Sequence, residues 1–308
     1  MSAVIRHILV PLDGSKLAES VLPTAAAMAD GFGAQLTLLH IIEERPPETV
    51  HGQPHLTEAD QAQTYLEEVA RRPIFRERMV ELHVHRSKEG DVAESLMAHA
   101  REMDADLMIL STHGRSGLRG LLFGSIALRA LQRGTTPILL VNPTPSGEAP
   151  PFACRKILVP LDGTAAHEPA LPVATRLARS WGAALHLVIV VPTAQTLSGP
   201  EAATRVFMPM AKRALLDLAE SGGGEYLRNI AGGLIEEGVP TTSQVSRGEA
   251  AAAVIEATDK VGADLVVMAT HAKGAMDGFW SGSLTPKLMQ RLGRPLLLVR
   301  AEGEEVSR

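Results

Sequence analysis

Short apolar runs alternate along the chain with longer segments whose apolar residues recur at helical spacing. In the first half, the runs with strand character are 8–12, 35–42, 81–85, 106–110 and 137–141. The segments with helical character are about 15–30, 57–80, 91–103 and 124–132. Strands that are mostly apolar throughout, separated by helices, are typical of a parallel sheet covered on both faces. The pattern therefore predicts a doubly wound α/β domain with five strands.

Polar residues mark where two of these helices are expected to begin. Ser15 follows the first strand, and serine is a favoured N-cap because its hydroxyl accepts from a free backbone N–H. Thr57 is followed three residues later by Asp60, which resembles a capping box. Both positions predict helix starts.

The chain contains the same unit twice. IRHILVPLDGS at 5–15 and CRKILVPLDGT at 154–164 are identical at eight of eleven positions, at an offset of 149 residues. Later segments match at an offset of 158, so the second copy has gained about nine residues in its middle. Solenoid repeats have periods of only ~20–50 residues, so this period indicates a duplicated domain. We expect domains at 1–143 and 154–302, joined by a Pro- and Gly-containing linker at 144–153.

Composition excludes several classes of protein. The net charge of -5 and an aromatic content of 3% argue against a nucleic-acid partner, which usually needs a basic surface or stacking aromatics. The single cysteine, Cys154, cannot form an intrachain disulfide. No apolar run reaches the ~18 residues of a membrane span, and the first residues lead directly into a strand. We expect a cytoplasmic protein without a membrane partner.

The first candidate site lies at the end of the first strand. Ligands of doubly wound sheets bind at the carboxyl ends of the strands, where strand order reverses. Asp13 is placed to accept hydrogen bonds from a base or a ribose hydroxyl, and Gly14 permits a tight turn. Asp13 and Ser15 are also typical of a plain helix cap, so both interpretations stay open here.

The second candidate is the glycine-rich segment that follows the strand at 106–110. Its glycines, which leave backbone N–H groups uncovered, are Gly114, Gly117, Gly120 and Gly124. Ser125 then opens a helix whose partly positive end suits a phosphate, and Arg115 and Arg119 add charge. The alternative is a flexible connection before an ordinary cap. The segment is not a Walker loop, because no G-x4-G-K-[ST] occurs.

These motifs together carry a family resemblance. ILVPLDGS at 8–15, STHG and GS at 111–114 and 124–125, and the closing apolar strand resemble the universal stress protein family in its tandem two-domain form. The resemblance covers nearly the whole chain. It implies two Rossmann-like domains of the adenine nucleotide alpha hydrolase-like type. Nucleotide-binding members show G-x2-G-x9-G-[ST], and Ser111, Gly114, Gly124 and Ser125 match it, with Ser111 replacing the first glycine.

The resemblance implies that the first copy binds ATP, with Mg²⁺ or Mn²⁺ held largely by the phosphates. Asp13 would contact the adenine or ribose side. The residues that would line the adenine pocket are Pro11, Leu12 and Ile41, and those that would hold phosphates are Gly114, Gly124, Ser125 and the N–H of Ile126. The same loop adds His113, Arg115 and Gly117 as further candidate binding residues.

The second copy departs from this motif. Asp162, Gly282 and Ser283 remain as a weaker candidate set, but the other two glycine positions are Ala269 and Ala272. If position 272 needs a positive φ, alanine adopts it only with strain, and its methyl group crowds a phosphate. We expect the second site to be weaker or empty.

The leading hypothesis is an ATP-binding regulatory protein, to which the resemblance adds a role in stress tolerance. A slow ATP hydrolase, or a structural module that binds no nucleotide, are the alternatives. No catalytic residue is identified. His40, His83 and His85 show strand spacing without a cysteine or carboxylate pattern, so no protein-held metal is predicted. The resemblance also implies that the last strands of the two copies pair as an intrachain pseudo-dimer, and two chains could form a homodimer.

Overall fold

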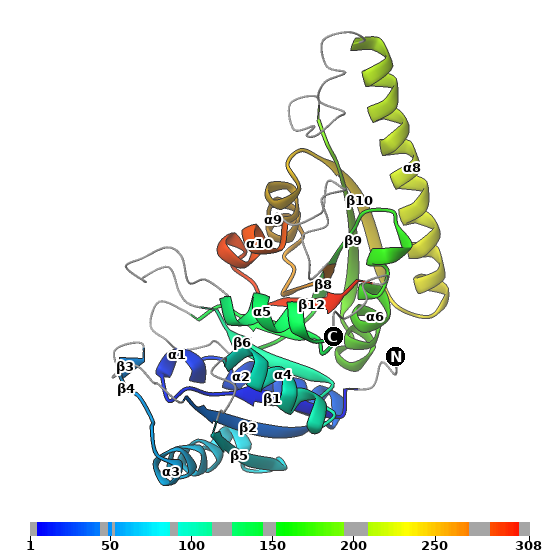
Figure 1. The fold of residues 1–308 in the computed structure, drawn as a ribbon. Coiled ribbons are helices and arrows are strands. Elements are labelled where there is room, and N and C mark those ends of the chain that lie inside the picture. Colours follow the sequence, from blue (N-terminus) through cyan, green and yellow to red (C-terminus); the bar gives the residue numbers. More distant parts are fainter. Residues whose placement is uncertain are drawn as a thin grey trace. The chain divides into compact units, whose positions relative to one another are not determined.

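The chain forms two compact units in a computed structural model, and each unit alternates strands and helices (Figure 1). The first consists of residues 1–153 with 305–308, and the second of 154–304. The structure describes residues 5–43, 49–50, 53–86, 92–112, 125–143, 152–193, 209–270 and 284–301.

The first unit follows the predicted order of elements. Its strands are β1 His7–Pro11, β2 Gln35–Ile42, β3 Thr49–Val50, β4 Gln53–Pro54, β5 Val80–Arg86, β6 Leu107–Ser111 and β7 Ile138–Val141. Its helices are α1 Lys16–Glu19, α2 Leu22–Phe32, α3 Ala59–Ala70, α4 Val92–Glu102 and α5 Ser125–Arg133, with a 3₁₀ turn at Pro73–Phe75.

The second unit repeats this order. Its strands are β8 Lys156–Leu161, β9 Ala184–Val191, β10 Thr241–Arg247, β11 Leu265–Thr270 and β12 Leu296–Arg300. Its helices are α6 Ala170–Trp181, α8 Pro209–Glu236, α9 Ala250–Val261 and α10 Leu284–Arg291, with a 3₁₀ turn at Ala165–His167.

Each unit contains a five-stranded parallel sheet, which confirms the predicted fold. The strand order is β7-β6-β1-β2-β5 in the first unit and β12-β11-β8-β9-β10 in the second. The chain moves outward from β1 to β2 and β5, then returns to the other side of β1 for β6 and β7. Strand order therefore reverses beside β1 and, in the second unit, beside β8. This is the position where such sheets bind ligands.

An aspartate ties the amino end of each sheet together. Asp106 Oδ2 accepts from the backbone N–H groups of Arg6 at 2.7 Å and His7 at 3.1 Å. Asp264 Oδ2 accepts from Arg155 at 2.7 Å and from the next residue at 3.1 Å, which is the same arrangement. A carboxylate that accepts two backbone N–H bonds is a strong link. Both copies thus share one device that joins the central strand to its neighbour.

Two predicted helices differ from the structure, and prolines account for both differences. The helix expected at 15–30 is split between α1 and α2, with Pro23 in the first turn of α2. The helix expected at 57–80 ends at Ala70, shortly before Pro73. Proline lacks the N–H that a helix interior needs, so it starts helices rather than continuing them. The Thr57 capping box is also wrong, since α3 has Glu58 as N-cap without a side-chain hydrogen bond.

The second unit has a much longer helix, α8, where the first has α3. It spans 28 residues against 12. A glycine triplet lies in its middle, and Gly223 faces β9 so closely that an added Cβ would lie 3.3 Å from Ile189 Cγ2. Gly222, in contrast, has open space around it. Gly223 therefore permits close packing of α8 against β9, while the space around Gly222 would also accept a larger residue.

Candidate functional site

The turn after β1 is organised by its own side chains. Asp13 Oδ1 accepts from the Ser15 N–H at 2.9 Å and from the Ser15 hydroxyl at 2.6 Å. Ser15 Oγ in turn accepts from the Ala18 N–H at 3.1 Å, which makes Ser15 the N-cap of α1, as predicted. The Asp13 side chain is half-buried. The capping role of these residues is therefore present in the structure, and it holds Asp13 in a fixed position.

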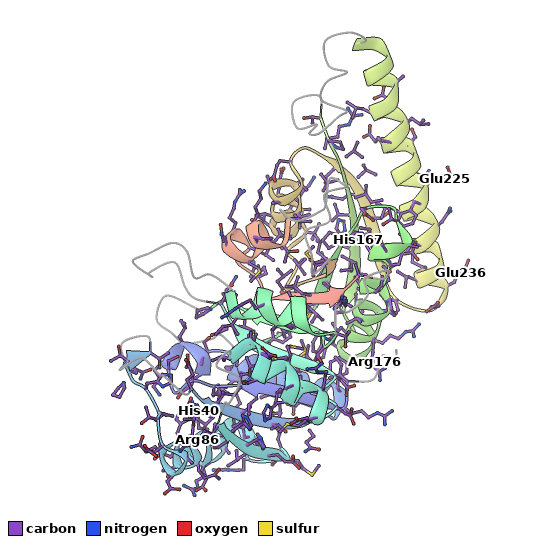
Figure 2. The ribbon with its side chains drawn as sticks, viewed as in Figure 1. His40, Arg86, His167, Arg176, Glu225 and Glu236 are labelled. Carbon is purple, nitrogen blue, oxygen red and sulfur yellow. The ribbon has the colours of Figure 1, made fainter. Side chains whose placement is uncertain are left out.

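Residues 53–56 lie against this turn. The Lys16 N–H donates to Gln53 Oε1 at 2.6 Å, and Gly14, at φ +88°, leaves room for Leu56, whose Cδ1 would lie 3.1 Å from a Cβ at position 14. The buried His40 ring donates from Nδ1 to the Leu12 carbonyl at 2.7 Å (Figure 2). Burial lowers the pKa of His40, so a neutral ring braces the strand end.

Five predicted site residues meet at the carboxyl edge of the first sheet. They are Pro11, Leu12, Asp13, Ile41 and Ser111. The Leu12 N–H donates to Leu39 of β2 at 2.8 Å, which extends the β1–β2 pairing past the strand end. On the other side, Thr112 donates from its N–H to Val141 at 2.9 Å and from its hydroxyl to Asn142. The edge thus combines mostly buried apolar side chains with the half-buried Asp13 carboxylate.

The rest of the predicted loop is only partly described. Ser125 and Ile126 form the first turn of α5, as expected. The remaining predicted loop residues lie outside the described residues, as do the weaker candidates of the second copy: His113, Gly114, Arg115, Gly117, Gly124, Gly282 and Ser283.

A buried acid and a tyrosine lie behind the first turn. Glu19 is 8% exposed and forms ion pairs with Lys16 and Arg72, each at 3.0 Å. Burial raises the pKa of Tyr65, and the nearby carboxylates of Glu19 and Asp13 raise it further. The tyrosine oxygen is buried without a hydrogen bond of good geometry among the described residues. The Tyr65 hydroxyl of the first unit is therefore a buried polar group near Asp13 that is available for a further hydrogen bond.

In the equivalent turn of the second unit, the Asp162 side chain pairs with other side chains of the same segment. Asp162 Oδ1 accepts from the Thr164 N–H at 2.9 Å and from its hydroxyl at 2.7 Å. His167 Nδ1 lies 2.8 Å from Asp162 Oδ2, and the two side chains are 12% and 13% exposed. Burial alone would raise the pKa of Asp162, but the hydrogen bonds from His167 and Thr164 outweigh it and lower the pKa. Both carboxylate oxygens are thus engaged.

Two further pairs occupy the second unit. The Tyr226 hydroxyl donates to Glu168 Oε1 at 2.9 Å, where the first unit has Tyr65 and Glu19. At the end of β11, the hydroxyls of Thr270 and Thr285 lie 2.7 Å apart. The Tyr226 hydroxyl is therefore bonded, whereas the Tyr65 hydroxyl has no bond of good geometry among the described residues.

The structure also reveals a cluster that the sequence analysis missed. His83 and His85 of β5 and His99 of α4 each offer a ring nitrogen, and these atoms lie within 4.8 Å of one another. Histidines two apart on a strand share a face, which the sequence pattern does show. The third member lies on the following helix, and single-strand spacing does not reveal it.

The search for membrane spans among the described helices found none with both the length and the apolar character required. Cys154 is buried, and burial raises the pKa of its thiol to about 12. A thiol in that state is a poor nucleophile, because the reactive form is the thiolate.

Two doubly wound parallel domains in tandem define a duplicated α/β protein, and each domain has an Asp-Gly-Ser or Asp-Gly-Thr turn at its switch point. The sequence model of the universal stress protein family matches residues 5–142 and again residues 153–300. The chain therefore belongs to the universal stress protein family, in a tandem two-domain form, which confirms the resemblance noted in the sequence.

Individual relatives and solved structures are similar to parts or all of this chain. A universal stress protein of Mycolicibacterium smegmatis is 31% identical over 141 residues, which cover 44% of this chain and 45% of that protein. This chain thus matches less than half the length of that relative. A universal stress protein of Archaeoglobus fulgidus has the same fold, with a TM-score of 0.69 and 15% identity over 99% of this chain and 100% of the other. Another solved universal stress protein, in complex with cAMP, covers 45% of this chain and 98% of its own, at 20% identity and a TM-score of 0.35.

Proposed function

We propose that this protein is a regulatory, stress-related ATP-binding protein of the cytoplasm, with its competent site in the first unit. The adenosine side lies against Pro11, Leu12, Asp13 and Ile41, and the phosphates against the segment from Ser111 to Ile126, including Gly114 and Gly124. Mg²⁺ or Mn²⁺ is held largely by the phosphates. The residues described at this edge suit an adenine nucleotide, because the half-buried Asp13 carboxylate adjoins the half-buried Pro11 and the buried apolar side chains of Leu12 and Ile41.

The difference between the two Asp-Gly turns carries the proposal. In the second unit, His167 takes one oxygen of Asp162 and Thr164 takes the other. The equivalent of His167 in the first unit is Ala18, whose methyl group cannot pair with an aspartate. A ligand that needs Asp162 must displace the His167 ring from a contact that is largely shielded from water, and loss of a hydrogen bond to a charged group costs ~1.5–3 kcal/mol. Ala269 in place of Ser111 adds to the expectation of a weak second site.

The duplication supplies a matched pair of variants for testing this assignment. The purified full-length protein is first denatured, and released adenine nucleotide is quantified per chain by chromatography. Titration with ATP and magnesium then compares Asp13→Ala with Asp162→Ala. We expect about one site per chain, at least tenfold weaker binding for Asp13→Ala, and unchanged affinity for Asp162→Ala. Loss of a hydrogen bond to a charged group, ~1.5–3 kcal/mol, corresponds to this tenfold or greater change.

Each other outcome of this experiment points to a different function. Two sites per chain would contradict a degenerate second unit. No binding, with or without magnesium, would favour a structural module. Conversion of added ATP to ADP that is lost in Asp13→Ala would favour the slow hydrolase, whereas a triphosphate recovered intact supports regulation.

We also propose that the last strands of the two units pair within one chain. The support is their sequence, since ILLV in β7 and LLLV in β12 are apolar strands at one side of each five-stranded order. Val299→Glu should then loosen the pair and speed hydrogen exchange in the first unit. Exchange that is unchanged in the first unit would contradict pairing, whatever the variant does to the second.

A further inference from the structure

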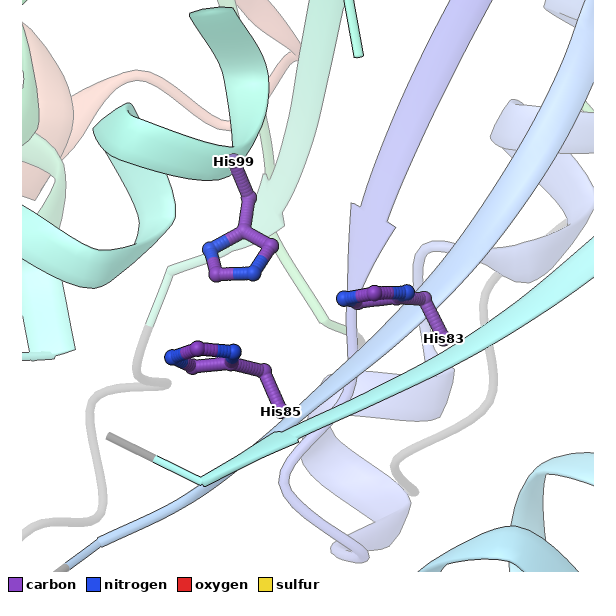
Figure 3. A group of neighbouring side chains, drawn as sticks. All are labelled: His83, His85 and His99. Atoms are coloured by element: carbon purple, nitrogen blue, oxygen red, sulfur yellow. The ribbon is translucent and has the colours of Figure 1, made fainter. Parts of the chain in front are cut away.

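Three histidine rings of the first unit face a common point. Figure 3 shows the rings of His83 and His85, from β5, turned toward the ring of His99, from α4. The ring centroids of His85 and His99 lie 4.2 Å apart, and those of His83 and His99 lie 5.1 Å apart. One ring nitrogen of each histidine lies within 4.8 Å of the other two. His99 is buried, while the two strand histidines are half-buried.

The backbone fixes the protonation of His99. Its Nδ1 lies 2.8 Å from the Ser95 carbonyl oxygen, one helical turn earlier. A carbonyl only accepts, so Nδ1 carries the proton and the lone pair of a neutral ring lies on Nε2. Metal-ligating histidines usually show this arrangement, with the second nitrogen bonded to a carbonyl or a carboxylate. His99 is therefore oriented and in the required tautomer before any ligand arrives.

The fold explains why these residues meet. His83 and His85 lie two positions apart on β5, so they share one face of the sheet. The helix α4 then runs back along the strand. His99 lies seven residues after the first residue of α4, which is ~10 Å along the helix axis. His83 lies three residues before the end of the strand, also ~10 Å from it. The two distances match, which brings the helix residue opposite the strand pair.

The second unit has no such cluster at the equivalent positions. β10 pairs with β9 as β5 pairs with β2, so His83 corresponds to Gln244 and His85 to Ser246. Gln244 Nε2 donates to Ser246 Oγ at 3.0 Å. His99 corresponds to Ala257 in α9. The same framework is thus built without histidines, so folding does not require them.

We propose that His83, His85 and His99 form a binding site for a divalent transition-metal ion, with Zn²⁺ as the preferred ion. Three imidazoles with a fourth position open to water are a known zinc ligand set, with Zn–N distances of ~2.0–2.1 Å. Ligand nitrogens around such an ion lie ~3.3 Å apart, so the rings must close by no more than about 1.5 Å from the 4.8 Å limit. Small side-chain rotations accomplish this.

The electrostatics of the cluster suit a cation at neutral pH. Burial lowers the pKa of His83, and the neighbouring His99 and His85 lower it further, because two adjacent imidazolium ions repel each other. The Glu102 carboxylate acts in the opposite sense and adds negative charge near the site. Histidine binds a metal through its neutral form, so protons compete with the metal as the pH falls through the ordinary histidine range near ~6.5.

The site is independent of nucleotide binding and can be tested without ATP. Tag-free full-length protein is treated with a chelator, dialysed, and titrated with ZnCl₂ by calorimetry at pH 7.5 and at pH 5.5. The variants borrow the residues of the second unit: His83→Gln, His85→Ser and His99→Ala. His186→Gln, in the second unit, is the matched control, because it also removes a buried histidine. Co²⁺ reports the geometry through its visible absorption.

We expect one Zn²⁺ per chain at pH 7.5, with at least ~10- to 100-fold weaker binding in each cluster variant, since loss of a mere supporting group already costs that much. His186→Gln should bind as the wild type does. Co²⁺ should give the intense visible absorption of a four-coordinate ion, and His83→Gln should abolish this absorption. His83→Gln keeps the test valid even if His99→Ala folds poorly. No binding by the wild type, or equal binding by His83→Gln and His85→Ser, overturns the proposal. Equal loss in the His186→Gln control would do the same.

Discussion

Replacing His167 with alanine tests the self-pairing of the second Asp-Gly turn. Ala18 occupies the equivalent position of the first unit, so alanine fits this framework without steric conflict. The substitution leaves Asp162 with its bonds to Thr164 and removes the imidazole 2.8 Å from its second oxygen. We expect the second unit to lose stability.

The burial of the pair sets the size of this loss. An exposed ion pair contributes only ~0–1 kcal/mol. Here the side chains are 12% and 13% exposed, so water competes poorly for them. A hydrogen bond to a charged group in such a setting contributes ~1.5–3 kcal/mol. With a urea m-value of about 2 kcal/mol/M for a unit of this size, the unfolding midpoint should fall by about 1 M.

The chain offers a convenient signal for this measurement. Its two tryptophans, Trp181 and Trp280, both belong to the second unit, so tryptophan fluorescence follows that unit alone. Urea unfolding of His167→Ala is compared with the wild type near neutral pH and again as the pH is lowered toward about 3. The folded pKa of Asp162 lies below its ordinary value, so its contribution is complete above ~3.9 and is lost as pH falls through the folded pKa.

The difference between the two proteins should therefore be present above ~3.9 and shrink as the pH falls through the folded pKa of Asp162. A midpoint that is unchanged near neutral pH would refute the buried-pair interpretation. A difference that remains at full size once Asp162 is protonated would also refute it, because a neutral carboxyl group is a weaker acceptor than a carboxylate.

Glycine substitutions give further predictions, each with a control in the chain. Gly14→Ala should destabilise the first unit by more than Gly163→Ala destabilises the second, as urea unfolding measures, because both have positive φ but only Gly14 has Leu56 at 3.1 Å. The backbone strain that both substitutions share is ~1–2 kcal/mol. Equal losses of unfolding free energy would show that the Leu56 side chain moves away without cost. Gly222→Ala should stabilise α8 by ~1 kcal/mol, whereas Gly223→Ala should gain less because its Cβ meets β9. Equal gains in unfolding free energy would contradict that packing.

Local sequence signals predicted much of the framework. The apolar runs gave the sheet, and the repeated ILVPLDG segment gave the duplication. Ser15 was identified as a cap because its position, directly after a buried strand, determines its partner within three residues. Where these predictions were wrong, at Pro23 and Pro73, the information was also local: proline ended the helical pattern while the apolar spacing continued through it.

Long-range contacts were not predictable in this way. His99 joins His83 and His85 only because a helix folds back along a strand, and the strand spacing of the pair gives no sign of a third member. His167 meets Asp162 because the second copy forms a 3₁₀ turn where the first has α1. The phosphate-loop assignment stays a prediction, because most of its residues lie outside the described part of the chain.

The central strand of each unit is held in the same way at one end and differently at the other. Asp106 and Asp264 make equivalent bonds in the two copies, while the Asp-Gly turn at the other end of the same central strand is paired differently in each. The same sheet framework thus accepts two different pairings of its Asp-Gly turn. We therefore expect the turns at 13–19 and 162–168 to be exchangeable, which would give chains that carry two turns of either kind.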